Sequence, residues 1–303
     1  EKLVELIGGS ADLAESNGVA LKNATIMQKP ELNIPNSSIG GKYLHFGIRE
    51  HAMASIMNGL ALYGFSRPFG ATFLIFSDYQ KPAIRLASLM QLPVIYVWTH
   101  DSIGLGEDGP THQPVEQLWS LRSIPGFNVV RPCDANEVSQ AWLKIIKDKK
   151  PAGIVLTRQN IPTLDRKIYA SEQGVSKGGY VLSEAKNNQA ELILIATGSE
   201  VQLALDAQKQ LEEQKISTRV VSMPCVEWFL AQDENYQKQV LPKDIKKIAI
   251  EAGSTLGWYR FVGTEGAVIG LDHYGASSKP DILFKEYGIS VENIVATAKK
   301  LIN

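Results

Sequence analysis

The chain has 303 residues, enough for two domains of ordinary size, and 44% of them are hydrophobic while 21% are charged. This is the composition of a soluble globular protein. The formal net charge of −1 gives no reason to expect nucleic acid or an anionic membrane as a partner. No apolar run approaches the roughly 18 residues of a membrane span, and no secretory signal opens the chain.

Apolar runs of strand length alternate with helical patterns over most of the sequence, which is typical of βαβ units. We therefore expect an α/β fold of two consecutive domains, each with a mainly parallel sheet flanked by helices. The expected strands of the first half are Leu3–Gly8, Tyr43–Phe46, Ala71–Phe76, Pro93–Trp98, Asn128–Arg131 and Gly153–Leu156. The expected helices, where apolar residues recur every three or four positions, are Arg49–Tyr63, Tyr79–Met90, Val115–Arg122 and Asn136–Lys147. Asp134 suits the N-cap of the last helix, and Pro82 suits the first turn of its own.

The pattern fails between Gln159 and Gly179, where Gly, Pro and polar residues indicate a surface connection. We place a domain boundary near residue 170, which gives a first domain of residues 1–170 and a second of residues 171–303. The strands expected in the second domain are Leu192–Ala196, Thr218–Ser222, Lys247–Glu251 and Ala267–Leu271. Helices are expected at Glu200–Gln214 and Val291–Leu301.

Two further features concern the context of the chain. Cys133 and Cys225 form no CxxC and have no His at metal-ligand spacing, so we expect two buried, reduced thiols and a cytoplasmic protein. The chain starts without Met and enters a strand-like run almost at once, which suggests a fragment or a chain whose first residues are missing.

The segment Thr99–Pro114 holds the densest concentration of reactive side chains. It follows the expected strand Pro93–Trp98 and reads THDSIGLGEDGPTHQP, with two histidines and three acidic residues among glycines and prolines. A polar loop of this kind is expected beyond the carboxyl end of a strand, where open α/β sheets keep their binding crevices. The loop is therefore a candidate functional site.

Two more segments allow a structural and a functional interpretation. Glu50 lies in the first turn of the helix expected from Arg49, where a carboxylate favours the helix dipole, but it could instead point into a crevice and bond a heterocycle nitrogen. Phe73, Phe76 and Tyr79 recur every third residue, a spacing that fits either core packing or stacking on a planar ring. The residues alone leave both alternatives open.

Taken together, these segments resemble transketolase along essentially the whole chain. The motifs that match in order and spacing are Gly8–Leu13, Gly47–Met53, Thr72–Phe76, Thr99–Pro114, Arg131–Asp134, Leu156–Asn160 and Ala196–Val201. The resemblance covers the pyrimidine-binding domain, clipped at its amino terminus, and the carboxyl-terminal domain. It does not cover the amino-terminal domain, whose Gly-Asp-Gly motif holds magnesium or calcium and the cofactor diphosphate.

The resemblance implies thiamine diphosphate as cofactor and a homodimer, with the pyrimidine in this part of one subunit and the diphosphate in the first domain of the other. Glu50 matches the catalytic glutamate that protonates the pyrimidine nitrogen, in a water-poor slot that raises its pKa. Phe73, Phe76 and Tyr79 match the aromatic pocket around the pyrimidine. Asp12 matches an aspartate that contacts the cofactor, although it could also cap a helix. No metal ligand is expected within this chain.

The substrates implied are sugar phosphates, a ketose donor and an aldose acceptor, between which a two-carbon ketol unit passes. Asp108 matches the residue that accepts a hydrogen bond from the C2 hydroxyl, and His112 matches a catalytic contact to the first hydroxyl or carbonyl oxygen. The positions that match the terminal phosphate site are Ser16, His100 and Arg158. In isolation, both histidines could be loop or core groups, and Arg158 could be a surface ion-pair partner.

Three alternatives remain open at this stage. A related thiamine enzyme, either deoxyxylulose phosphate synthase or the β-subunit of a 2-oxo acid dehydrogenase, shares this two-domain half, and the former also shares the pattern of Gly106–Gln113. The isolated chain could also be a non-catalytic fragment that contributes only the pyrimidine half-site and dimer contacts. Finally, it could be the carboxyl-terminal subunit of a split transketolase, which needs the amino-terminal domain in trans rather than in cis.

Overall fold

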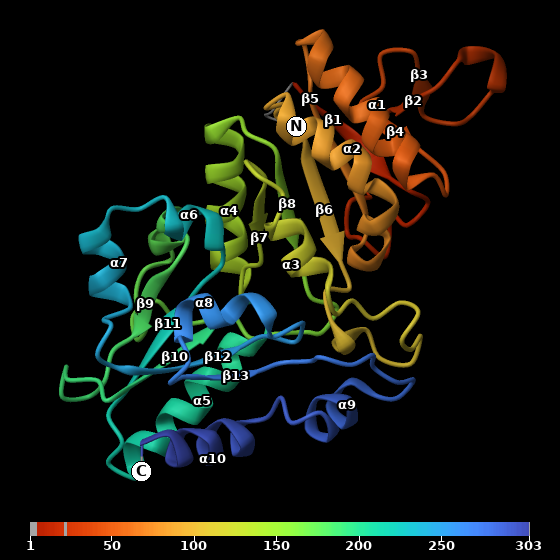
Figure 1. Cartoon of the computed structure of the whole chain (residues 1–303). Helices are drawn as coiled ribbons and strands as arrows, with labels where there is room; N and C mark the ends of the chain where they lie inside the picture. Colours follow the sequence, from red (N-terminus) through yellow and green to blue (C-terminus); the bar gives the residue numbers. More distant parts are fainter. Residues whose placement is uncertain (1–4, 21–22, 303) are drawn as a thin grey trace.

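The computed structural model describes residues 5–20 and 23–302, which form two α/β units (Figure 1). The first contains a parallel sheet of eight strands in the order β3-β2-β4-β1-β5-β6-β8-β7. These strands are β1 Leu6–Ser10, β2 Ile26–Met27, β3 Ser37–Ser38, β4 Tyr43–His45, β5 Arg67–Phe73, β6 Ile95–Thr99, β7 Asn128–Val130 and β8 Ala152–Val155. The two-domain α/β class predicted from the sequence is confirmed.

Helices cover both faces of this sheet because its central strands are apolar on both sides. They are α1 Glu50–Tyr63, α2 Ser77–Leu89, α3 Gln117–Arg122 and α4 Ala135–Asp148. In β6, Tyr96 and Trp98 belong to a core with α1, α2 and α3, whereas Ile95 and Val97 belong to a core with α4. This alternation follows from the two-residue period of a strand.

The second unit has five strands in the order β13-β12-β10-β11-β9, all parallel except β9. They are β9 Tyr180–Ser183, β10 Leu192–Ala196, β11 Thr218–Ser222, β12 Lys246–Ile250 and β13 Ala267–Ile269. Its helices are α5 Glu200–Glu213, α6 Val226–Leu230, α7 Glu234–Val240, α8 Tyr259–Val262, α9 Pro280–Glu286 and α10 Val291–Ile302. Residues from α5 and α10 pack on one face of the sheet, and residues from α6, α7 and α8 on the other.

Two predictions in the first unit are wrong. The strand expected over 71–76 ends at Phe73, and a 3₁₀ turn at Leu74–Phe76 leads directly into α2. Because α2 therefore begins at Ser77, Pro82 lies inside the helix and not in its first turn. By contrast, Asp134 does cap α4, since its side chain accepts a hydrogen bond from the Glu137 amide at 2.8 Å. Residues 3 and 4 of the first expected strand lie outside the described residues.

A buried network of charged side chains joins the two units. Arg131, which follows β7, is 0% exposed and pairs with Asp101 at 2.8 Å and with Glu200 at the start of α5. Arg122 meets Glu251 through two hydrogen bonds of 2.8 Å each. Burial raises the pKa of Glu200, whereas the Arg122 guanidinium, acting against burial, holds the pKa of Glu251 below its usual value. Removing one partner would leave buried charges unpaired.

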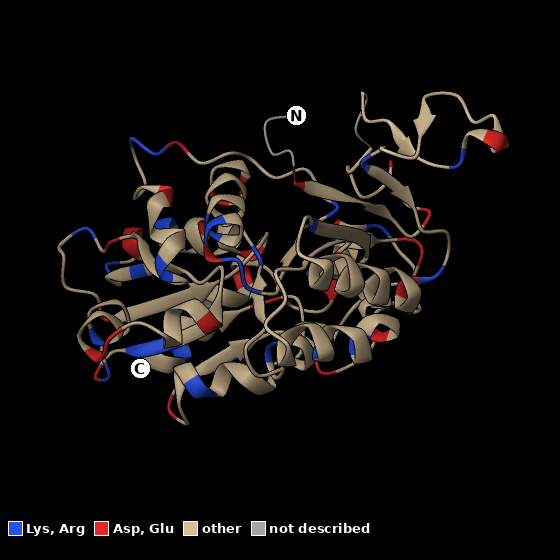
Figure 2. Ribbon diagram, turned by 90° about the horizontal axis from the view of Figure 1, so that it is seen from above, with Lys and Arg blue, Asp and Glu red and all other residues tan. Residues whose placement is uncertain are grey.

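The two cysteines agree with the prediction made from the sequence. Cys133 and Cys225 are both free and buried, as predicted. In the view of Figure 2, positions with lysine, arginine or acidic residues are spread over both units. Within residues 5–20 and 23–302, no helix has the length and apolar character needed to cross a bilayer.

Candidate functional site

The predicted site residues gather at the carboxyl-terminal edge of the first sheet. Strands β1, β4, β5, β6 and β8 are parallel, so the segments that leave them all start at the same edge. In an open α/β sheet this edge is where ligands bind. The structure places Phe73 there as the last residue of β5, and Asp12, Glu50, His100 and Arg158 in the segments that follow β1, β4, β6 and β8.

Glu50 is positioned by the turn between β4 and α1. Gly47 has a φ of +68°, a left-handed conformation that glycine adopts at no steric cost, and it redirects the chain after β4. The side chain of Arg49 then donates from Nε to the Phe46 carbonyl at 3.0 Å. Glu50 is the first residue of α1 and is half-buried. Its carboxyl group therefore lies at a helix amino terminus but is partly withdrawn from solvent.

Three aromatic rings form a row beside it. The centroids of Phe73 and Phe76 are 6.1 Å apart with planes at 12°, and those of Phe76 and Tyr79 are 6.2 Å apart with planes at 26°. The 3₁₀ turn between β5 and α2 explains this row, because residues three apart eclipse one another in such a turn. Exposure increases along it, from 8% at Phe73 to 64% at Tyr79.

A cavity of about 530 Å³ joins the carboxylate and the rings. Its lining consists of Ala11, Asp12, Leu13, Ile48, Glu50, Phe73, Phe76, Tyr79 and His112. His112 meets the Phe76 ring edge-on, with centroids 5.6 Å apart. Asp12 has a φ of +66° and precedes a turn, so the alternative prediction that it caps a helix is wrong. This cavity can hold a planar, mostly apolar ring with one polar edge.

A chain of hydrogen bonds supports His100. Ser10 Oγ donates to Asn17 Oδ1 at 2.8 Å, and Asn17 Nδ2 donates to Thr99 Oγ1 at 2.8 Å. Thr99 Oγ1 is in turn 2.8 Å from His100 Nδ1. The direction of this last hydrogen bond depends on the tautomer of the His100 ring. A Thr99 hydroxyl that donates to Nδ1 leaves Nε2–H of His100 as a donor.

The electrostatics of His100 favour its neutral form. Burial lowers the pKa of His100 from its ordinary value of 6.5, and the positive charge of Arg158 lowers it further, against a smaller opposing effect of Asp101 and Asp108. The backbone of His100 is left-handed, with φ of +58°, which directs the chain out of β6. A neutral imidazole with one N–H donor suits recognition of an anionic or hydroxylated ligand.

A second cleft, of about 610 Å³, lies on the other side of His100. It brings together the three positions expected at a phosphate site, Ser16, His100 and Arg158. Asn17, Thr157, Gln159 and Asn160 also line it. Ser16 and Arg158 are exposed, so both can meet a ligand that enters from solvent. Arg158 and several neutral donors suit a phosphate group, while the exposed carboxylate of Glu15 also lines the cleft and opposes an anion there.

The second unit holds the His112 loop in place. Gln113, which is 1% exposed, donates from Nε2 to the carbonyls of Gly106 and Ala276 at 2.9 and 3.0 Å. Ser277 also donates to the carbonyl of Glu107. Asp108 is exposed on this loop and lines neither of the two cavities described above, although its charge reaches His100. The loop therefore depends on contacts between the two units.

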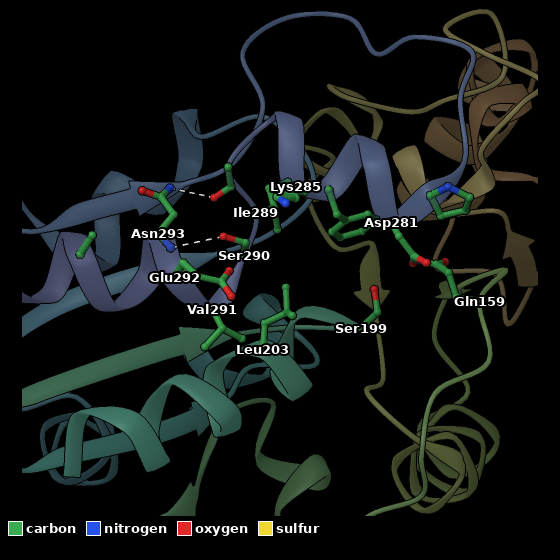
Figure 3. Close-up of a pocket in the computed structure, with 14 residues that line it drawn as sticks. Gln159, Ser199, Leu203, Asp281, Lys285, Ile289, Ser290, Val291, Glu292 and Asn293 are labelled. Carbon is green, nitrogen blue, oxygen red and sulfur yellow. Dashed lines mark hydrogen bonds between the residues drawn. The ribbon is translucent and has the colours of Figure 1, made fainter. Parts of the chain in front are cut away.

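Sequence reasoning missed the groups that position the site. Asn17, Thr99, Gln113 and Ser277 have no assigned role in the sequence patterns, yet they hold the two histidine-bearing segments. A further cleft of about 940 Å³ lies between Gln159 and the segments of α9 and α10 (Figure 3). None of the predicted site residues lines it.

Comparison with protein families gives two matches. Residues 1–163 match the family described as "Transketolase, pyrimidine binding domain", and residues 178–290 match "Transketolase-like TK C-terminal domain". The chain is 52% identical over 291 residues to the transketolase of Aquifex aeolicus, which covers 95% of this chain and 41% of that protein. It is 49% identical over 305 residues to the transketolase of Bacillus subtilis, covering 100% of this chain and 45% of that protein. The chain thus spans less than half the length of these relatives.

Solved structures are similar as well. A Pichia stipitis transketolase in complex with sedoheptulose 7-phosphate superposes with a TM-score of 0.92 at 42% identity, over 98% of this chain and 43% of that one. A protein described as a split gene transketolase, an inactive β4 tetramer, gives a TM-score of 0.73 at 23% identity. It covers 98% of this chain and 92% of its own, and its likeness shows the shared fold alone.

Proposed function

Because the chain belongs to the transketolase family, as its pyrimidine-binding and carboxyl-terminal part, we propose that it supplies the pyrimidine half of a thiamine diphosphate site. Together with an amino-terminal domain in cis or in trans, it transfers a two-carbon ketol unit from a ketose phosphate to an aldose phosphate. The observation that carries this proposal is the cavity shared by Glu50, the three aromatic rings and His112. The related thiamine enzymes considered above are less consistent with relatives that are all described as transketolases.

The lining of this cavity fits one part of the cofactor. Phe73, Phe76 and Tyr79 offer ring faces for a planar heterocycle, and stacking adds about 0.5–1.5 kcal/mol per pair beyond the area buried. No lysine or arginine is among the residues that line it. A diphosphate with its magnesium or calcium ion would therefore be held elsewhere, in agreement with the diphosphate-binding domain that the family places on the partner subunit.

Glu50 is the group that would act on the bound heterocycle. When bound, thiamine diphosphate supplies the carbon nucleophile that cleaves the ketose. The role of Glu50 is to hold a proton at a ring nitrogen, which requires a carboxyl group in a site with little water. Its place beside an apolar row, at the first position of α1, supports this role. Asp12, at the same cavity, is available to contact the ring from the β1 side.

The adjoining cleft would bind the sugar phosphate. Arg158 presents a guanidinium fork to phosphate oxygens, and Ser16 and neutral His100 add hydrogen-bond donors. His112, which lines the cavity of the aromatic row, would contact the oxygen at the reacting end of the ketose. Asp108 would accept a hydrogen bond from the C2 hydroxyl of the substrate. Because Asp108 is exposed on its loop, this contact requires that the loop moves toward the cleft or that the substrate extends to the Asp108 carboxylate.

A second copy of the chain is the partner that the surface favours. Exposed apolar side chains gather on α1 and α2, which pack against each other, and just beyond their ends. They are Ile56, Leu62, Tyr63, Phe65, Leu86, Leu89 and Met90, with exposed fractions from 41% to 80%. An apolar surface of this kind marks an interaction site. It supports a homodimer formed through the first unit.

Mixing the chain with a separately made amino-terminal transketolase domain, thiamine diphosphate and Mg²⁺ tests the proposal. Ketol transfer between sugar phosphates, measured by product formation, is expected only in the complete mixture. Omission of either polypeptide serves as the control. A mixture in which both polypeptides associate and bind the cofactor, yet show no transfer, would support the alternative of a non-catalytic fragment or subunit.

A further inference from the structure

A cavity in the second unit carries an excess of positive charge. It has a volume of about 460 Å³, within the roughly 300–1,000 Å³ of small-molecule sites, and is built from α6, α7, α8 and the start of β12. Four cationic side chains line it, Lys238, Lys243, Lys247 and Arg260, against one carboxylate, Glu234. The chain as a whole has a net charge of −1, so this excess is local.

Lys247 is the unusual member of this group. In β12 it lies beside Ile193 of β10 and on the same face as Ala249, both of which belong to the apolar core under α6 and α8. The residue is only 6% exposed, so its aliphatic stem follows the core while its ammonium group reaches the cavity. The Nζ atom donates to the carbonyls of Ile245 and Lys243 at 2.7 and 3.4 Å.

This ammonium group has no acidic partner in contact. Within the described part of the chain, no carboxylate lies within 4 Å of Lys243, Lys247 or Arg260, while Glu234 is paired with Lys238 at 2.6 Å. Burial lowers the pKa of Lys247, against a smaller opposing effect of the Asp244 carboxylate. A nearby anion would stabilise the charge that burial disfavours.

Apart from Gln237 and Gly263, the remaining lining is apolar and partly aromatic. Phe229 and Phe261 stand with centroids 6.3 Å apart, and Leu230, Leu241 and Val262 complete the walls. We propose that this cavity binds a small phosphorylated compound with a planar, apolar group. The phosphate meets Lys243, Lys247 and Arg260, whose planar fork matches phosphate oxygens, and the ring packs on Phe261, since Phe229 is only 1% exposed.

This site is separate from the pyrimidine cavity. It lies against the first residues of β12, whereas the catalytic segments sit at the carboxyl ends of the strands of the other sheet. The proposal therefore does not depend on the function proposed above. Ligand binding here can be tested on the chain alone.

Isothermal titration of the full chain with phenyl phosphate is the test. Saturable binding is expected, with an affinity that falls about tenfold or more in Arg260→Gln and Lys247→Met, since charge-assisted hydrogen bonds to phosphate are lost. Lys300→Gln removes an exposed charge from α10 and should leave the affinity unchanged. Repeating these titrations in an Arg158→Gln background, which removes the guanidinium of the other cleft, separates this event from binding there.

Three other ligands, namely inorganic phosphate, phenol and an oligoglutamate peptide, define the chemical class that the cavity binds. Inorganic phosphate and phenol should each bind more weakly than phenyl phosphate, because each lacks one half of the recognised structure. The pKa of Lys247, followed by NMR on its side-chain nitrogen, should rise when phenyl phosphate is present. No binding of phenyl phosphate, equal binding in Arg260→Gln, or tighter binding of an oligoglutamate peptide would each overturn the proposal.

Discussion

His100 lies flat against Phe73, with ring centroids 3.7 Å apart and planes at 24°. Phe73 thus meets a residue of the proposed phosphate cleft, and it also stacks with Phe76 in the proposed cofactor cavity. The stacked rings of His100 and Phe73 therefore connect the two cavities. Any displacement of His100 is therefore expected to disturb both sites.

Arg158→Ala is expected to impair phosphorylated substrates selectively. In the reconstituted enzyme the KM for a ketose phosphate should rise by about tenfold or more, because a charge-assisted contact worth about 1.5–3 kcal/mol is lost. The KM for an unphosphorylated ketose should change little. Steady-state kinetics with both substrates provide the comparison, and equal increases would remove the phosphate role of Arg158.

Thr99→Val is expected to remove the hydrogen bond that favours one tautomer of the His100 ring. The substitution keeps the shape of a buried residue but removes the hydroxyl between Asn17 and His100, at a cost of about 1–3 kcal/mol for the amide left unpaired. Nitrogen-15 NMR of the imidazole should change from one tautomer to a mixture.

Thr72→Val is the matched control for this substitution. Thr72 lies on the neighbouring strand opposite Trp98 and is also fully buried, but its hydroxyl has no partner among the described residues. Loss of the Thr72 hydroxyl should leave the free energy of unfolding unchanged or increase it. If both variants lose equal stability and leave the His100 spectrum unchanged, the hydrogen-bond chain has no positioning role.

The protonation of His100 should depend on Arg158. Its pKa in the folded chain should lie below 6.5, and Arg158→Gln should raise it because a nearby positive charge is removed. Since the unfolded chain binds this proton first, the contribution of His100 to stability is present above about pH 6.5 and is lost as the pH falls toward the folded-state pKa. An NMR titration measures this pKa directly, and a midpoint at or above 6.5 would contradict the assignment.

Arg131→Met is expected to weaken the junction between the two units. It leaves Asp101 and Glu200 buried without their cation, which costs about 3–5 kcal/mol. Urea unfolding gives the loss of stability. Lys209→Met removes a partner from the exposed pair with Asp206 and should change stability by less than about 0.5 kcal/mol. Similar losses in the two variants would mean that the buried network is not structurally important.

Much of the fold could be predicted because strands and helices leave local signals. The bounds of β10 and β11 match their apolar runs at Leu192–Ala196 and Thr218–Ser222. The antiparallel strand β9 and the short helices α6 to α9 were not predicted, since each is stabilised by packing more than by its own pattern. The strand expected over Ala71–Phe76 extends three residues too far, because Leu74–Phe76 form a 3₁₀ turn.

The candidate site was predictable only where the residues themselves carry the chemistry. The loop of Thr99–Pro114 and Glu50 were found from their residue types and from the family resemblance. The contacts that position them were not, because Gln113 meets Ala276 and Arg131 meets Glu200 across long separations in the sequence. No local pattern encodes such contacts, which depend on how the two units dock.

The most direct test of the account is turnover by Glu50→Gln in a complete enzyme that contains this chain. The amide keeps the size of the side chain but holds no acidic proton, so the account predicts a loss in kcat of about 10²–10⁴-fold with thiamine diphosphate affinity nearly unchanged. Glu213→Gln, at an exposed position of α5, should behave as the unsubstituted enzyme. A Glu50→Gln enzyme that keeps most of its ketol transfer would contradict the central claim.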